Sequence, residues 1–542
     1  MRKLLGFCCA TLVLAGGLKA ASADLRLIQA VKNSDLKTVR SLLAQHVDVN
    51  ATEADGSSAL HWAAERDSAE MTELLLKAGA DAKAATRYGI TPLFFACTNG
   101  DAAIVKDLLD AGADANSTFE EGETALMTAS LTGKVDAVKM LLSHGAKVNV
   151  AEPWKSQTPL MYAASEGNTD AVNMLIEFGA EVKAKSKSGF TPLLFAVRNG
   201  HIDTTKALLA HGANVNDVAP DGTCALNMAI VNAYFELANV LLEAGANPNL
   251  PDPRGSGLHI LAWLRKPGSD PNAGAGGAPK GPPIPTGNIT SLELAKSLLK
   301  HGANPNVRIS WKEIKYNKDF GQVRNPIDIP IGRHNISYVG ATPFYVAAQT
   351  GDAPYMQVLF DGGADPKLPT VQNITPLMAA AGLGYWDGES PGPYAGCSEA
   401  ERLAAVKLAL DLGNDINAHA DFGEFPIEGD GKYLLLYYPA NIDRLPENAL
   451  GDVRWSGSTA LHGAVISGQP SIVQFLIDHG AQVDAKNRLG WTPLMVAEGI
   501  FVTNTKKEFP DAAKILKKAM AEKGLKADST SPAQAPAETR SN

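Results

Sequence analysis

Histidine is the residue in this chain best suited to acid–base or metal chemistry, and its eleven copies are spread along the sequence. Zinc sites need His and Cys at short, fixed spacings, and the sequence holds neither an H-E-x-x-H run nor a paired-cysteine motif. The adjacent acids Glu120 and Glu121 are typical of a solvated surface. Asp421-Phe422-Gly423 has the letters of a kinase triplet, but no phosphate-binding glycine loop accompanies it. We therefore expect no catalytic residues, no metal site and no cofactor.

Cysteine content and charge exclude further classes of function. Of five cysteines, two lie at the start of the chain, and the others are Cys97, Cys224 and Cys397. Three sparse cysteines are too few for a disulfide framework. The net charge is −9, whereas nucleic acid and anionic membrane surfaces attract basic proteins. We expect no nucleic-acid partner.

The first 23 residues have the pattern of a cleavable export signal. Arg2 and Lys3 precede a short apolar run, and the segment closes on the small residues Ala21-Ser22-Ala23. Cleavage before Asp24 would remove three basic residues and no acid, which shifts the net charge from −9 to about −12. No other stretch approaches the ~18 apolar residues of a membrane span. The sequence thus predicts a periplasmic or secreted protein with no membrane insertion after signal cleavage.

A repeat of 32 to 34 residues organises most of the chain. One marker is an apolar residue that follows Thr-Pro or a similar pair, at Leu60, Leu93, Leu126, Leu160, Leu193, Leu226, Leu258, Phe344, Leu377, Leu461 and Leu494. A second marker is Gly-Ala before a polar residue, at Gly79, Gly112, Gly145, Gly179, Gly212, Gly245, Gly302, Gly363 and Gly480. Because the two markers stay in phase, each repeat is one structural unit that stacks on its neighbours.

These markers resemble the ankyrin repeat, whose unit of about 33 residues carries a T-P-L-H-x-A signature. Thr-Pro-Leu occurs at Thr91, Thr158, Thr191, Thr375 and Thr492, and His fills the fourth place at His61, His259 and His462. The resemblance implies an all-α repeat solenoid of stacked helix pairs with protruding β-hairpins, in an exported, bacterial ankyrin repeat domain-containing protein. We count eleven repeats after a degenerate helix pair at residues 24–50.

The helix ends follow from the signature. Threonine caps the first helix of a pair, proline suits its first turn, and glycine ends it in a left-handed conformation. We expect the three signature histidines to hold the hairpins by hydrogen bonds. Cys97 and Cys224 fall at core positions, whereas Cys397 lies in an inserted loop.

Long insertions interrupt the repeat in the second half of the chain. Leu258 to Phe344 and Leu377 to Leu461 are each about 50 residues longer than one repeat. The predicted organisation is a signal peptide at 1–23, N-terminal ankyrin repeats at 24–264, a Gly/Pro-rich insertion at 265–288, C-terminal ankyrin repeats at 289–524 with insertions at 308–339, 383–398 and 421–456, and a disordered tail at 525–542.

Ankyrin proteins typically bind partners through hairpin tips and the exposed ends of the first helices. By register, the tips offer Arg87, Tyr88, Ile90, Glu120, Glu121, Trp154, Lys155, Phe190 and Trp491. The helix ends offer Glu65, Arg66, Thr98, Asn99, Ser165, Glu166, Arg198 and Asn199. The insertions add Trp311, Tyr316, Tyr433, Tyr437 and Tyr438. Aromatic and Arg side chains are typical interface anchors.

The sequence therefore predicts an exported, monomeric scaffold that mediates protein–protein interaction and is not an enzyme. Two alternatives stay open: a periplasmic accessory protein that supports a redox or detoxifying enzyme, and a small-ligand site built from the C-terminal insertions. The insertions either brace the repeats or choose the partner. Residues 308–339 carry a net charge of about +3 and residues 421–456 about −4. The alternative to recognition of a partner protein is therefore that these two insertions pair with each other.

Overall fold

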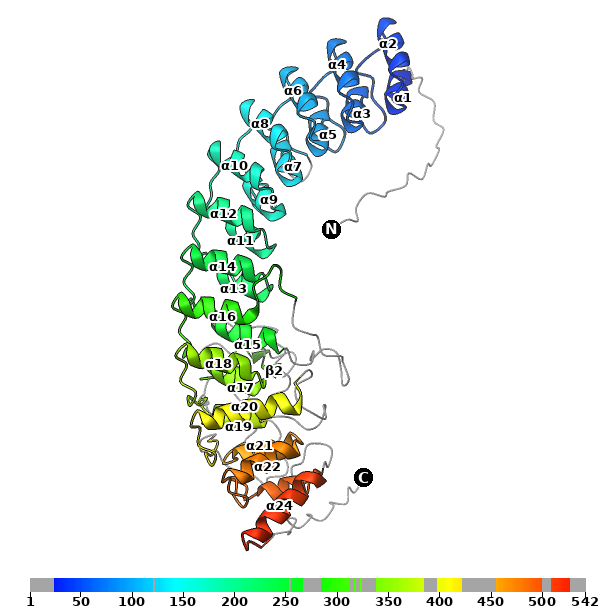
Figure 1. Cartoon of the computed structure of the whole chain (residues 1–542). Helices are drawn as coiled ribbons and strands as arrows, with labels where there is room; N and C mark the ends of the chain where they lie inside the picture. Colours follow the sequence, from blue (N-terminus) through cyan, green and yellow to red (C-terminus); the bar gives the residue numbers. More distant parts are fainter. Residues whose placement is uncertain are drawn as a thin grey trace, which may run out of the picture. The chain divides into compact units, whose positions relative to one another are not determined.

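The computed structural model describes residues 24–119, 122–252, 255–266, 284–310, 316–317, 322–323, 338–384, 397–421, 455–499 and 508–526. The chain divides into two compact units, Met1–Lys187 and Ser188–Asn542. In each unit, short helices follow one another in antiparallel pairs in chain order, as the colours of Figure 1 show.

Unit 1 holds five helix pairs within its described residues. They are α1 (Arg26–Lys32) with α2 (Leu36–Ala44), α3 (Ala59–Glu65) with α4 (Ala69–Lys77), α5 (Pro92–Asn99) with α6 (Ala102–Asp110), α7 (Ala125–Thr132) with α8 (Val135–Ser143), and α9 (Pro159–Glu166) with α10 (Thr169–Glu177).

Unit 2 holds seven pairs in the part of it that is described. They are α11 (Pro192–Arg198) with α12 (Ile202–Ala210), α13 (Ala225–Val231) with α14 (Phe235–Glu243), α15 (Gly257–Arg265) with α16 (Ser291–Lys300), α17 (Pro343–Gln349) with α18 (Ala353–Asp361), α19 (Pro376–Ala381) with α20 (Glu399–Asp411), α21 (Ala460–Ile466) with α22 (Pro470–Asp478), and α23 (Pro493–Ala497) with α24 (Pro510–Glu522). The expected eleven repeats and the preceding N-terminal pair are confirmed.

The first helix of each pair begins as the signature predicts. In α5 and α9, the side chains of Thr91 and Thr158 accept a hydrogen bond from the backbone N–H three residues on, and proline follows directly. Gly100 ends α5 with φ 81°, and Gly167 ends α9 with φ 78°. An L side chain rarely adopts this conformation, which explains glycine there.

The signature position is the centre of the core. All eleven of its residues, from Leu60 to Leu494, are at most 1% exposed. Each such burial contributes about 1.5–3 kcal/mol relative to an exposed side chain. Small residues such as Ala163 and Ala164, both 0% exposed, let the first helices of adjacent repeats pack closely. The fold is therefore the predicted all-α repeat solenoid.

The hairpins between pairs hold less β-structure than expected. Isolated bridges join Thr52 to Ser58, Thr118 to Thr124 and Val218 to Cys224. Among the described residues, the named strands are β1 (Tyr316–Asn317) and β2 (Gln322–Val323), which pair antiparallel. Neighbouring hairpins instead bond to each other, as the backbone N–H of Lys187 does to the Lys155 carbonyl at 2.8 Å.

Asparagine side chains join successive repeats beneath the hairpins. The Asn149 Nδ2 donates to the Gly179 carbonyl at 3.0 Å, and its Oδ1 accepts from the Glu181 N–H at 2.8 Å. Asn50 makes the same two bonds to Gly79 and Asp81, at 3.1 and 2.8 Å. The Gly-Ala marker of one repeat is thus bound by the preceding repeat, a function that we did not predict from the sequence.

Candidate protein-binding surface

The signature histidines connect three of the hairpins to the helix before them. In His462, Nδ1 accepts from the Thr459 N–H at 3.2 Å, so Nε2 carries the proton and donates to the Trp491 carbonyl at 3.1 Å. His61 and His259 do the same toward the carbonyls of Ile90 and Ala341, each at 3.1 Å. Burial lowers the pKa of His259 and that of His462 to about 4, and lowers the pKa of His61 as well. These residues are structural, as expected.

The tip at Arg87 and Tyr88 exposes both side chains. The Thr86 Oγ1 accepts from the Tyr88 N–H at 3.3 Å and the Ile90 N–H at 3.2 Å, which fixes the turn. The Arg87 Nη2 donates to the Tyr88 hydroxyl at 2.6 Å, and its guanidinium lies 4.7 Å from the ring centroid. Tyr88 is 47% exposed. The pair is a planar, cationic and aromatic surface suited to a protein partner.

Trp154 is the most exposed aromatic side chain among the described residues, at 76%. Its backbone is held by Glu152, whose side chain is buried. The Glu152 carboxylate accepts from the N–H groups of Trp154 at 2.7 Å, Lys155 at 2.8 Å and Gln157 at 2.9 Å. Glu152 was not among the sequence candidates, because nothing in its spacing distinguishes it from an ordinary surface acid.

The helix-end candidates of unit 1 differ in exposure and in their hydrogen bonds. Those of Glu65, Arg66, Thr98 and Glu166 are exposed, and that of Ser165 is half-buried. The Asn99 Nδ2 donates to the carbonyls of Ala64 and Glu65 at 2.9 and 3.0 Å. Asn99 therefore caps the preceding first helix, and its amide protons are already used.

In unit 2, the candidates at α11 form a cationic and aromatic cluster. Arg198 is exposed, and its guanidinium lies 5.3 Å from the ring centroids of both Phe190 and Phe195. The two rings are 5.5 Å apart. Phe190 is half-buried and Asn199 exposed.

One tip candidate, Trp491, is corrected by the structure, and a second, Ile90, is only partly accessible. Trp491 is only 8% exposed and belongs to the core, and Ile90 is half-buried. Both directly precede the helix-capping threonine, and their carbonyls accept from His462 and His61. This bond draws the residue inward, so the position serves packing, and the true tip lies two or more residues earlier.

The remaining candidates lie outside the described residues or are described only in their backbone. They are Glu120, Glu121, Trp311, Tyr433, Tyr437 and Tyr438, and the backbone of Tyr316 is in β1.

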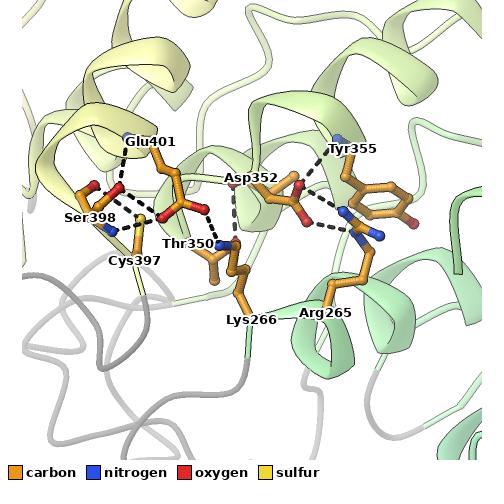
Figure 2. Close-up of polar contacts among 9 residues, drawn as sticks. Arg265, Lys266, Thr350, Asp352, Tyr355, Cys397, Ser398 and Glu401 are labelled. Carbon is orange, nitrogen blue, oxygen red and sulfur yellow. Dashed lines mark hydrogen bonds and ion pairs between the residues drawn. The ribbon is translucent and has the colours of Figure 1, made fainter. Parts of the chain in front are cut away.

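Four charged residues, which we call the clasp, join three successive repeats of unit 2. The Arg265 guanidinium donates to both carboxylate oxygens of Asp352, at 2.6 and 3.0 Å, and Asp352 is 1% exposed. The Lys266 ammonium lies 2.8 Å from the Glu401 carboxylate. Figure 2 shows the two basic side chains reaching different carboxylates. The partners are 87 and 135 residues apart, so sequence spacing gave no signal for them.

Arg265 of the clasp and Ser398, which bonds Glu401 of the clasp, belong to the packed repeats although we assigned both to insertions. Arg265 is the last residue of α15, although we placed it in the 265–288 insertion. Ser398 caps α20 and bonds Glu401 reciprocally, although we placed it in the 383–398 insertion. The Lys266 hydrogen bond, with help from the Ser398 N–H, lowers the pKa of Glu401 to about 2.

The three cysteines among the described residues, Cys97, Cys224 and Cys397, are free and buried. Burial raises the pKa of Cys97, of Cys224 and of Cys397, so none of the three is a ready nucleophile at neutral pH. Cys397 packs under α20 and is not an exposed loop thiol. Within the described residues, His, Cys, Asp and Glu do not gather in a group able to hold a metal. No described helix combines the length and apolar character needed to cross a bilayer.

Stacked helix pairs with signature histidines, capped turns and exposed tips define an ankyrin-type repeat protein. The family model for ankyrin repeats in three copies matches residues 27–119, 97–186, 178–252 and 431–525. These segments cover more than half of the chain, which therefore belongs to the ankyrin-repeat family.

Similar proteins share only short segments with this chain. Potassium channel AKT1 of rice (Oryza sativa subsp. indica) is 34% identical over 73 residues, which are 13% of this chain and 7% of the channel. Protein phosphatase 1 regulatory subunit 27 of Homo sapiens is 41% identical over 49 residues, 9% of this chain and 32% of that protein. The crystal structure of the human ASB11 ankyrin repeat domain is 30% identical and covers 41% of this chain and 98% of its own, with a TM-score of 0.38.

Proposed function

We propose that this chain is an exported ankyrin scaffold that binds another protein through its hairpin tips and first-helix ends. The observation that carries the proposal is a contrast in burial. The signature residues are at most 1% exposed, whereas Tyr88 and Trp154, at the tips of the same repeats, are 47% and 76% exposed. Both aromatic side chains lie on hairpin tips, and exposed aromatic side chains of this kind are typical anchors of protein interfaces.

Export is the second part of the proposal and is supported by the sequence of residues 1–23 alone, which lie outside the described residues. N-terminal sequencing of the protein from its native host is expected to begin at Asp24. A retained Met1, or recovery in the cytosolic fraction, would contradict export without touching the binding proposal.

Site-specific photo-crosslinking in the native host tests the binding proposal. A photoreactive residue at exposed Thr98, on a first-helix end, is expected to capture a protein. The same residue at exposed Lys77, at the end of the second helix α4, serves as the control and is expected to capture none. Equal capture at both positions, or none at either, would contradict the proposal.

The captured protein also decides what kind of scaffold this is. A redox or detoxifying enzyme as partner would make the chain its accessory protein. Light scattering of the purified chain is expected to give the mass of a monomer, about 57 kDa or slightly less after signal removal.

A further inference from the structure

We propose that the tip formed by residues 147–157 and 181–187 of unit 1 is a docking site for an acidic protein segment that also carries an apolar side chain. We call this surface the Trp154 tip. The inference rests on the proposed function and deepens it, because it names the anchor residue and the chemistry of the partner.

The two hairpins of the Trp154 tip lie side by side. The Lys187 N–H donates to the Lys155 carbonyl at 2.8 Å, and the Asn149 side chain bonds the Gly179 carbonyl and the Glu181 N–H. These bonds join the two hairpins into one surface within unit 1.

Charge on this surface is opposite to that of the whole chain. Five exposed lysines lie on the two hairpins, at Lys147, Lys155, Lys183, Lys185 and Lys187. The acids are Glu181, which is exposed, and Glu152, which is 3% exposed. Because Glu152 accepts backbone N–H groups from inside the turn, its charge is directed away from a ligand. The exposed side chains therefore carry a net charge of about +4 on a protein whose total is −9.

The tip is also rigid before a partner arrives. The bonds to Glu152 hold the backbone of Trp154 and Lys155, and Ser156 completes the turn with φ 53°. Gly122 lies on the hairpin that precedes the Trp154 tip. A Cβ at Gly122 would lie only 2.4 Å from the Pro153 ring, so the hairpin of Gly122 touches the hairpin of Pro153 beside the tip. A turn whose backbone is held in this way loses little backbone freedom on binding, which favours affinity.

A protein segment fits this surface better than a lipid headgroup layer. A protein that lies in a membrane interface needs a contiguous apolar face. Trp154 is the one large hydrophobic side chain exposed within these two hairpins, so the geometry is one apolar contact surrounded by ammonium groups. That arrangement matches a short acidic segment with a Leu or Phe among its carboxylates.

Fluorescence anisotropy with the full-length chain tests the inference. The probe is a labelled twelve-residue peptide of alternating Asp and Glu with one central Leu-Phe pair, and the control peptide replaces every acid with Lys. Binding of the acidic peptide alone is expected, and it weakens as salt rises. W154A is expected to weaken binding by about 30-fold, as for a hot-spot residue. The charge reversal K155E/K187E is expected to weaken it at least as much.

F178A is the matched control, because Phe178 is a 43%-exposed aromatic of the same unit that lies at the end of α10. It is expected to bind the peptide as the unchanged chain does. A second readout is acrylamide quenching of Trp154 fluorescence, taken as the difference between the emission of the unchanged chain and that of W154F. Trp154 is expected to be accessible to acrylamide in the free chain and protected from it by the acidic peptide.

Three outcomes would overturn the inference. They are equal binding of both peptides, unchanged binding by W154A, and binding to phosphatidylglycerol vesicles without binding to the acidic peptide. Failure of the Trp154 tip can be distinguished from failure of the proposed scaffold function. If the Thr98 photo-crosslink still captures a protein from the W154A chain at full yield, the scaffold function stands and the Trp154 tip is not its site.

Discussion

Leu193 shows how a single side chain contributes to the stack. It is 0% exposed and lies at the signature position of α11. L193A is expected to destabilise unit 2 by about 2–5 kcal/mol, because it leaves a cavity between adjacent repeats. K206A, an exposed position on the neighbouring helix α12, is expected to stay within about 0.5 kcal/mol. Urea unfolding measures both, and equal losses would show that the repeat register is wrong.

The signature histidines make stability depend on pH. His259 and His462 have pKa values of about 4 when folded and about 6.5 when unfolded. The unfolded chain therefore binds protons first as the pH falls. Stability is expected to be complete above about pH 7 and to fall between about pH 6.5 and 4, by up to about 3 kcal/mol for each histidine.

The variant H462Q separates this effect from general acid unfolding. It is expected to be less stable at pH 7, because the Gln amide, whose oxygen and nitrogen both lie at its end, cannot replace both the Nδ1 bond to Thr459 and the Nε2 bond to the Trp491 carbonyl. Its stability is also expected to fall less steeply below pH 6.5, because unfolding of the variant takes up about one proton fewer than unfolding of the unchanged chain. Urea titrations at pH 7 and pH 5 measure the slope, and an unchanged slope would contradict the assignment of a buried, neutral His462.

At the scale of elements, the clasp joins α15 to the repeats of α17 and α20. D352N leaves the half-buried Arg265 guanidinium without its counter-charge, at a site where Asp352 itself is buried, and is expected to cost about 3 kcal/mol. K266A removes a partly exposed pair and is expected to cost at most about 1 kcal/mol. Unfolding midpoints of the two variants check this order, and the reverse order would contradict the role of the Arg265–Asp352 pair.

The inserted segments test whether partner choice lies outside the repeats. We replace residues 310–337 and 424–453 with short Gly-Ser links. If these segments recognise a partner, the unfolding midpoint is expected to stay unchanged and binding is expected to be lost. A large fall in the midpoint with binding retained would make them braces. The cut points spare Trp455, which is 1% exposed and packs with the repeats.

Periodicity predicted the elements well and their long-range partners poorly. Two in-phase markers were enough to place eleven of the twelve helix pairs and to assign His61, His259 and His462 to the hairpins. The clasp escaped prediction, because an ion pair across 87 or 135 residues has no sequence period.

Trp491 was misplaced for a different reason. A tip aromatic and a core aromatic differ by only two or three positions in the sequence, and the structure is needed to show that Trp491 is 8% exposed and that its carbonyl accepts from His462. The Trp154 tip was predicted in part, since Trp154 and Lys155 were candidates, but the supporting carboxylate of Glu152 was not.

At the scale of the whole molecule, we propose that buried residues stabilise the repeats and that exposed residues bind the partner. The separation holds within each unit: signature residues are fully buried, while Arg66, Tyr88, Trp154 and Arg198 are available to a partner. Substitution of an exposed residue changes the free energy of unfolding by about 0.5 kcal/mol or less, whereas loss of an interface anchor weakens the free energy of binding by about 2 kcal/mol or more.

The most direct test measures stability and partner capture together in one multiple variant, R66A/Y88A/W154A, with the photoreactive residue kept at Thr98. The account predicts an unfolding midpoint equal to that of the unchanged chain and at least about 30-fold less crosslinked partner. A lowered midpoint with the partner still captured at full yield would contradict it, because the exposed aromatics would then serve the stack and not the partner.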